Sequence, residues 1–309
     1  MTALSFEGRV AVVTGAGRGI GRAYALLLAE RGASVVVNDL GGSAEGTGTD
    51  PGPAAAVVDE ITAAGGTAVA DDHDVASVDG AQALIDTAVE RFGRLDVLIN
   101  NAGIVRWAAF PDADADNLAA HLAVHLFGSF HASRAAWPVM VEQGYGRIVM
   151  TTSTGVFGLP NNTSYAAAKG AVIGLARSLA TAGRRRGIKV NCIAPAAFTR
   201  MAGGPGSQEE PAGEDPRAAQ MAPGLVAPLV GLLAHESCPV TGEIYVAGAG
   251  RFARLVVATT EGYVHPAGDP SIEDVVAHWD AINDDSSLTV PADLVDWSRT
   301  FLSHLPPEG

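Results

Sequence analysis

Three side chains, Ser153, Tyr165 and Lys169, have the types and spacing needed to handle a proton on a substrate oxygen. A free phenol titrates near ~10, so Tyr165 is too weakly acidic to act as a base at neutral pH. Lowering its pKa by ~2–3 units requires roughly 3–4 kcal/mol of preferential stabilisation of the phenolate, which a nearby ammonium and a cationic cofactor can supply. Lys169 follows Tyr165 by four positions, one helical turn on the same face. We therefore predict proton transfer at an alcohol or carbonyl oxygen held by Ser153, while a hydride moves on or off the adjacent carbon.

The segments around these residues predict a strand and a helix that bring them together. Residues 147–150 read as a buried strand ending near Ser153. A loop rich in Gly, Pro and Asn follows, and Tyr165 then opens an alanine-rich helix.

A glycine loop near the start of the chain predicts a nucleotide site. Residues 9–14 form a predicted strand that runs directly into Gly15, Gly19 and Gly21, and a helix follows over 22–31. This geometry points backbone N–H groups at a pyrophosphate. Ile20 stands where a G-x-G-x-x-G motif has its third glycine, so the spacing is T-G-x-x-x-G-x-G. A tight turn with no ligand is the alternative.

The second predicted strand, residues 34–38, ends on Asp39, about 20 residues past the glycines. A carboxylate there can accept both ribose hydroxyls of NAD and would repel the 2′-phosphate of NADP. This favours NAD as the cofactor. Arg18 instead favours NADP. A third interpretation is that Asp39 is a plain surface residue.

Further alternation of strands and helices predicts an α/β fold. Predicted strands cover 67–74, 95–99, 188–195 and 243–247, and predicted helices cover 54–64, a segment ending at 92, 114–143 and 224–234. We expect a Rossmann-type doubly wound parallel sheet of about seven strands with helices on both faces and a ligand crevice at the strands' carboxyl ends. The crevice would include Asp74 and the amides of Asn100 and Asn101. Residues 41–53 are rich in Gly and Pro and predict a flexible insertion.

The pattern divides the chain into a dinucleotide-binding catalytic domain, 1–254, and a C-terminal extension, 255–309. Within the domain, 196–222 is dense in Gly, Pro, Ala and acids and predicts a lid over the crevice, or a disordered surface loop as the alternative. The extension contains one predicted helix, 271–281, capped by Ser271. It is too short for a domain of its own, so we expect it to pack on the main domain or on a partner subunit.

Composition excludes several classes of function. The chain has 309 residues, 48% of them hydrophobic, with no leading basic-then-apolar signal and no apolar run of membrane-spanning length, which predicts a cytoplasmic protein without membrane contact. A formal charge of −14 argues against nucleic-acid binding. Two cysteines, Cys192 and Cys238, cannot form a disulfide framework, and Cys192 is most simply a small core residue. His121 and His125 lie one turn apart, but no Glu and no third ligand accompany them, so no metal is predicted.

Together these motifs, in this order, resemble the short-chain dehydrogenase/reductase family over about 6–250. The match comprises Thr14 to Gly21, Asp74, the Asn101-Ala102-Gly103 triplet, and the set Ser153, Tyr165 and Lys169. A closer resemblance is to the (3R)-hydroxyacyl-CoA dehydrogenase branch, and it is carried by residues 38–42, 125–130, 134–137, 235–238 and 246–250. This branch includes the dehydrogenase part of peroxisomal multifunctional enzyme type 2, which is also a 17β-hydroxysteroid dehydrogenase.

The resemblance implies a role for each matching residue. Ser153 would position the oxygen, Tyr165 would be the acid and base, and Lys169 would lower its pKa and hold the nicotinamide ribose. Cofactor contacts are expected from Gly15, Arg18, Gly19, Ile20, Gly21, Asp39, Asp74, Val75, Asn101, Ala102, Gly103, Tyr165, Lys169, Pro195 and Thr199. His125 stands where the wider family has an Asn that completes a proton relay, so the relay would run through His125 or a rearranged water. Arg200 is a candidate contact for a CoA phosphate.

Our main hypothesis is an NAD-dependent oxidation of a (3R)-hydroxyacyl-CoA to the 3-oxoacyl-CoA by a homodimer or homotetramer. The second hypothesis is a 17β-hydroxysteroid dehydrogenase, with or without the hydroxyacyl-CoA activity. An NADPH-dependent 3-oxoacyl reductase is the third, and Asp39 disfavours it. The alternative that is not an enzyme is a nucleotide sensor without turnover. It is disfavoured because a sensor needs no Ser, Tyr and Lys set.

Overall fold

The computed structural model describes residues 3–201 and 219–305. The chain divides into two compact units, Met1–Arg254 and Leu255–Gly309. Most of the predicted lid, 196–222, lies outside the described residues. Its described flanks meet, because Phe198 N–H donates to Met221 O at 2.8 Å.

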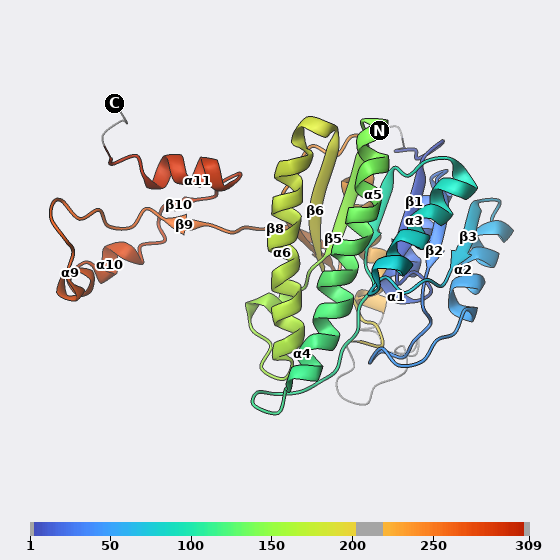
Figure 1. Cartoon of the computed structure of the whole chain (residues 1–309), viewed down its shortest axis with the longest axis horizontal. Coiled ribbons are helices and arrows are strands. Elements are labelled where there is room, and N and C mark those ends of the chain that lie inside the picture. Colours follow the sequence, from blue (N-terminus) through green and yellow to red (C-terminus); the bar gives the residue numbers. More distant parts are fainter. Residues whose placement is uncertain (1–2, 202–218, 306–309) are drawn as a thin grey trace. The chain divides into compact units, whose positions relative to one another are not determined.

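The first unit is built on an eight-stranded sheet in the order β3-β2-β1-β4-β5-β6-β7-β8, shown in Figure 1. The strands are β1 Val10–Thr14, β2 Ser34–Asn38, β3 Thr67–Asp71, β4 Val97–Asn100, β5 Gly146–Thr151, β6 Ile188–Pro195, β7 Ile244–Gly248 and β8 Arg251–Leu255. Pairing from β3 through to β7 is parallel throughout. The predicted doubly wound parallel sheet is confirmed. The edge strand β8 was not predicted, and β3 ends at Asp71, three residues before Asp74.

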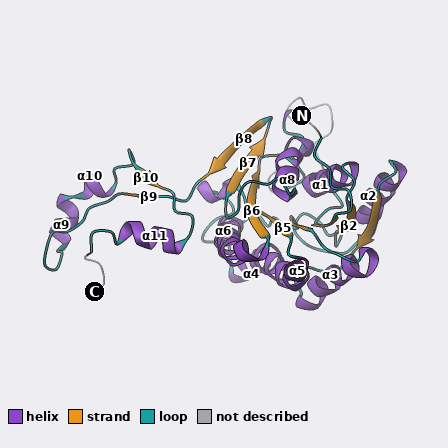
Figure 2. Ribbon diagram, turned by 90° about the horizontal axis from the view of Figure 1, so that it is seen from above, coloured by secondary structure: helices purple, strands orange, loops and turns teal. Residues whose placement is uncertain are grey.

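Helices cover both faces of this sheet (Figure 2). They are α1 Gly19–Glu30, α2 Gly52–Ala63, α3 Val78–Phe92, α4 Ala115–His121, α5 Ser129–Gln143, α6 Thr163–Gly183 and α8 Ala227–Ala234, with short turns of 3-10 helix at η2 Thr154–Phe157, η3 Arg184–Arg186 and η4 Pro223–Leu225. The residues Val10–Val13, Val35–Val37 and Val97–Ile99 are all buried, because strands covered on both faces lose all contact with water. This explains why the strands read as continuous apolar runs in the sequence.

The predicted helix over 114–143 exists, but it contains a turn of a different kind. Between α4 and α5 the segment η1, Leu122–Gly128, is π-helical, and it carries His125. A π-helical turn inside an α-helix costs regular hydrogen bonding and frequently marks a functional site.

The second unit is small, and its described residues, 255–305, form no buried core. It contains the antiparallel pair β9 Thr259–Thr260 and β10 Leu288–Thr289, with α9 Ile272–Ala277, α10 Trp279–Ile282 and α11 Leu294–Phe301. The predicted helix over 271–281 is therefore split at His278. Its predicted cap is present, since Ser271 Oγ accepts from Asp274 N–H at 3.1 Å. None of its described residues is buried, so the packing of this unit on the domain or a partner stays a prediction.

The close approach of α1 to β1 generates a first prediction. A Cβ on Gly21 would lie 2.2 Å from Gly15 O and 2.5 Å from Asn101 Nδ2, so a methyl group forces the glycine loop away from the end of β4. Gly21→Ala should lower the free energy of unfolding by at least about 2 kcal/mol. Gly174, in α6, has nothing within 4 Å of an added Cβ. Gly174→Ala is the control and should be neutral or stabilising by up to ~1 kcal/mol. Equal urea midpoints for the two variants would contradict this packing.

Candidate active site

The glycine loop and the end of β4 form one hydrogen-bonded unit. Thr14 Oγ1 accepts from the backbone N–H groups of Asn101 and Ala102, each at 2.9 Å. In return the Asn101 amide donates to Thr14 O at 2.9 Å and to Gly15 O at 3.1 Å. These bonds lie where the strand order reverses between β1 and β4, which is the ligand-binding position of doubly wound sheets.

A pocket of about 230 Å³ opens at this point. Twelve of the fifteen predicted cofactor residues line it, namely Gly15, Arg18, Gly19, Ile20, Gly21, Asp39, Asp74, Val75, Asn101, Ala102, Gly103 and Thr199. Tyr165, Lys169 and Pro195 are not among its described lining residues. The first turn of α1 has no side-chain cap, because the N-cap residue Arg18 makes no capping hydrogen bond. Free N–H groups at a helix start, next to a pocket, fit the pyrophosphate of a dinucleotide.

Asp39 is held in place by backbone donors. Its Oδ2 accepts from Gly17 N–H at 2.8 Å and its Oδ1 accepts from Gly41 N–H at 2.7 Å. A carboxylate oxygen has two acceptor positions, so each still has capacity for a ribose hydroxyl. The position of Asp39 in the pocket wall fits a diol ligand.

The insertion 41–53 lines the cofactor pocket, which the sequence did not indicate. Up to the start of α2 it contains no helix or strand, as predicted, and Gly42, Ser43 and Gly46 contribute to the pocket wall. It is attached to the loop after β4: Val105 N–H donates to Ala44 O and Arg106 Nε–H donates to Glu45 O, both at 2.8 Å.

Ser153 and Tyr165 face one another, as the spacing predicts. Ser153 caps η2 and accepts from Gly155 N–H at 3.0 Å, and Tyr165 lies in the first turn of α6. A Cβ built on Gly155 would lie 3.3 Å from Ser153 Oγ and 3.6 Å from Tyr165 Cε1, so both side chains border the same small space beside Gly155.

Lys169 is buried beneath the tyrosine. Its Nζ lies 5.7 Å from the centre of the Tyr165 ring and donates to Thr151 O at 2.8 Å. Thr152 Oγ1 donates to Lys169 O at 2.7 Å, which joins α6 to the end of β5. Burial lowers the pKa of Lys169 to about 7, and the nearby Cys192 thiol acts weakly in the opposite direction.

The expected lowering of the Tyr165 pKa does not come from the protein's own groups. Burial raises the pKa of Tyr165 above its ordinary value, and a hydrogen bond with Ser153 offsets only part of that rise. A phenolate inside the protein therefore needs the positive charge of a bound cofactor in addition to Lys169.

Two histidines hold the Tyr165 ring from one side. The rings of His121 and His125 are stacked at 5.9 Å, and each meets the Tyr165 ring edge to face, at 6.1 and 5.3 Å. His125 Nε2 lies 2.9 Å from Ile104 O, and His121 Nε2 accepts from Arg106 N–H at 3.2 Å. Both are fully buried, and burial lowers the pKa of each, so they are neutral at pH 7.

The proton relay expected at His125 stays a prediction, and two observations bear on it. The main-chain carbonyl of His125 accepts from Ser129 Oγ at 2.7 Å. Its Nδ1 is buried and has no hydrogen-bond partner within 3–201 and 219–305. The role of His121 was missed, although its spacing from His125 placed both on one helix face. Across the described segments, no group of three or more His, Cys, Asp or Glu side chains is arranged to hold a metal ion.

Comparison with known proteins places this geometry in a family. The family model described as short chain dehydrogenase matches residues 9–209, which include the glycine loop, Ser153, Tyr165 and Lys169. The chain belongs to the short-chain dehydrogenase/reductase family. It is a nicotinamide-dependent oxidoreductase that acts on CH–OH groups.

Relatives within this short-chain dehydrogenase family agree with the closer resemblance. A short-chain type dehydrogenase/reductase of Mycobacterium tuberculosis is 44% identical over 92% of this chain and 97% of its own length. Peroxisomal multifunctional enzyme type 2 of Drosophila melanogaster is 43% identical over 98% of this chain, which spans 50% of that protein. The solved structure of the latter superposes with a TM-score of 0.78 at 38% identity, covering 97% of this chain and 50% of the other.

The buried cation generates a second prediction. Between pH 7 and about 10 the unfolded chain keeps a proton on Lys169 that the folded protein releases, so folding becomes more favourable as pH rises through this window. Relative to Lys169→Met, the free energy of unfolding of the cofactor-free protein should increase by up to about 1.4 kcal/mol per pH unit. Urea denaturation at pH 7, 8 and 9 measures the difference. A difference that is constant with pH would contradict a lowered pKa.

Proposed function

We propose that this dehydrogenase uses NAD to oxidise the secondary alcohol of a (3R)-hydroxyacyl-CoA to the 3-oxoacyl-CoA. The observation that carries the reaction type is the grouping of Ser153, Tyr165 and Lys169. The substrate class rests on the resemblance of 38–42, 125–130 and 235–238 to the hydroxyacyl-CoA branch. A 17β-hydroxysteroid is the alternative substrate.

The residues divide the work in the oxidative direction. NAD, when bound, supplies the hydride acceptor. Ser153 donates a hydrogen bond to the substrate oxygen and fixes its distance from Tyr165. Tyr165 accepts the hydroxyl proton, and Lys169 stabilises the phenolate form that is able to accept it. His121 and His125 are neutral, so they add no positive charge near Lys169, and their rings pack against the phenol ring of Tyr165.

NAD is proposed as the cofactor because Asp39 lines the pocket at the end of β2. A carboxylate there favours a free ribose diol and repels a 2′-phosphate. Arg18 lines the same pocket and would favour NADP, so the proposal requires the Asp39 contribution to exceed that of Arg18. The homodimeric or homotetrameric state and the cytoplasmic location stay predictions; among the described residues no helix has the length and apolar character to cross a membrane.

The third prediction tests the chemistry. NADH formation by the wild-type protein should be rapid with a (3R)-hydroxyacyl-CoA and slow with its (3S) isomer and with a 17β-hydroxysteroid. Tyr165→Phe should lower kcat by about 10²–10⁴-fold, because the group that takes the proton is lost. Tyr24→Phe is the matched control: the Tyr24 hydroxyl is buried in the core, has no hydrogen-bond partner in the described part of the chain, and should be dispensable. Turnover of the steroid alone would refute the thioester proposal, and normal turnover by Tyr165→Phe would refute the mechanism.

The fourth prediction tests the cofactor. Asp39→Asn should lower the ratio of kcat/KM for NAD to that for NADP by about 10–100-fold, because one charge-assisted contact is lost and one repulsion is removed. Asp72→Asn, on an exposed neighbouring carboxylate, is the control and should leave the ratio unchanged. An unchanged ratio in Asp39→Asn would revive the NADPH-dependent reductase.

A further inference from the structure

A groove of about 860 Å³ runs beside the cofactor pocket, on the outer side of α1. One wall is α1, from its first turn to Glu30, and the other is formed by η4 and the start of α8, including Pro223 and Ala227. The groove shares Arg18, Gly19 and Arg200 with the cofactor pocket, so the two spaces adjoin. Its volume is within the range of sites that hold a large organic ligand.

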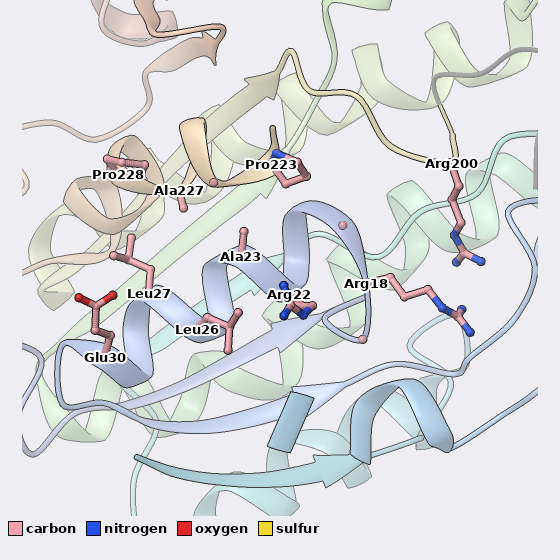
Figure 3. A pocket seen from close by; sticks show the side chains of 13 residues that line it. Arg18, Arg22, Ala23, Leu26, Leu27, Glu30, Arg200, Pro223, Ala227 and Pro228 are labelled. Atoms are coloured by element: carbon pink, nitrogen blue, oxygen red, sulfur yellow. The ribbon is translucent and has the colours of Figure 1, made fainter. Parts of the chain in front are cut away.

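Charge is distributed unevenly along this groove. Figure 3 shows Arg18 and Arg200 at one end, Arg22 next to them, and Glu30 at the opposite end. The whole chain carries 34 acidic and 20 basic side chains, and three of the basic ones lie at this end. A concentration of guanidinium groups against the overall charge indicates a site for an anion.

Arg18 and Arg22 have few acidic partners among the described residues. Arg22 forms an ion pair with Glu60 at 2.5 Å, and both side chains are nearly half exposed, so water screens that pair. Arg18 Nη1 is buried and no hydrogen-bond acceptor reaches it from the described segments of the chain. A buried guanidinium nitrogen without an acceptor is costly, and an incoming phosphate oxygen would relieve that cost. Arg200 donates to Gly42 O at 3.2 Å, which directs it towards the insertion that walls the cofactor pocket.

Between the two ends the groove is apolar. Ala23, Leu26 and Leu27 of α1 face Pro223, Ala227 and Pro228 across it. A ligand that fits this surface carries phosphates at one end and a less polar body beside them. Inorganic phosphate alone would use only the arginine end.

We propose that Arg18, Arg22 and Arg200 bind the phosphates of the CoA part of the substrate, with its adenosine or pantetheine segment along the apolar groove. This inference rests on the proposed function, since it takes the substrate to be a CoA thioester. Arg22 is the most diagnostic of the three, because it lines the groove and not the described wall of the cofactor pocket. Its loss therefore separates the thioester from the dinucleotide.

The test compares one acyl group on two carriers. For Arg22→Gln, KM for the (3R)-hydroxyacyl-CoA should rise about tenfold with little change in kcat, because a contact made equally in ground state and transition state is lost. KM for the same acyl group on N-acetylcysteamine, which has no phosphates, and KM for NAD should not change. Arg91→Gln, on the exposed end of α3, is the control for surface charge. Glu60→Gln is the control for the ion pair: it removes the partner of Arg22 but keeps the cation, so KM should not rise.

A second measurement keeps this subsite separate from the reaction. Titration calorimetry of the NAD-saturated protein with adenosine 3′,5′-bisphosphate should show binding that Arg22→Gln weakens about tenfold. Equal rises in KM on both carriers, or equal affinity of wild type and Arg22→Gln for the bisphosphate, would overturn the subsite. A change confined to NADP would reassign the arginines to the cofactor. Absence of thioester turnover in the wild-type protein would instead overturn the proposed function.

Discussion

Lys169 is 3% exposed, and its ammonium group donates to a single described acceptor, the carbonyl of Thr151. Removing a charge from water is expensive unless the surroundings compensate, and the fall of its pKa to about 7 measures how incomplete the compensation is. The histidine side chains packed nearby do not add to this cost. His121 and His125 are neutral, and a second cation there would raise the cost further. The charge on Lys169 is therefore the constraint around which β5, α6 and η1 are arranged.

Tyr165 and Lys169 must be considered as one titrating pair. Burial alone makes the neutral form of each more favourable, so the protein by itself favours an uncharged phenol beside a partly neutral amine. A phenolate with an ammonium is the opposite charge state, and each charge lowers the cost of the other. Positive charge on the oxidised cofactor favours the phenolate, and ribose hydroxyls would give the ammonium further acceptors. The phenolate form of Tyr165 is then favoured when the oxidised cofactor is bound. This limits proton transfer to the complex that can also accept the hydride.

The sequence predicted those parts of the structure that follow from local pattern. Strands buried on both faces must be apolar, so β1, β2 and β4 were visible as runs of Val, Leu and Ile. Tyr165 and Lys169 were paired correctly because helix periodicity fixes which residues share a face. The π-helical turn was not visible, since no local pattern marks it and its His125 contacts Ile104, which lies 21 residues earlier in the chain. The insertion 41–53 looked like a flexible loop for the same reason: its partners, Val105 and Arg106, lie far along the chain.

Those long-range contacts connect the catalytic and cofactor sides of the crevice. His121 and His125 contact Tyr165 with their ring faces and edges and hold the loop after β4 with their nitrogens. That loop holds the insertion, and the insertion forms the wall beside Asp39. A displacement of the wall by a bound dinucleotide would therefore be transmitted to the rings that pack on the phenol through hydrogen bonds to which the insertion contributes only its backbone carbonyls, Ala44 O and Glu45 O. Backbone contacts of this kind do not depend on side-chain identity in the insertion, which explains how a segment so rich in Gly and Pro can serve as a structural wall.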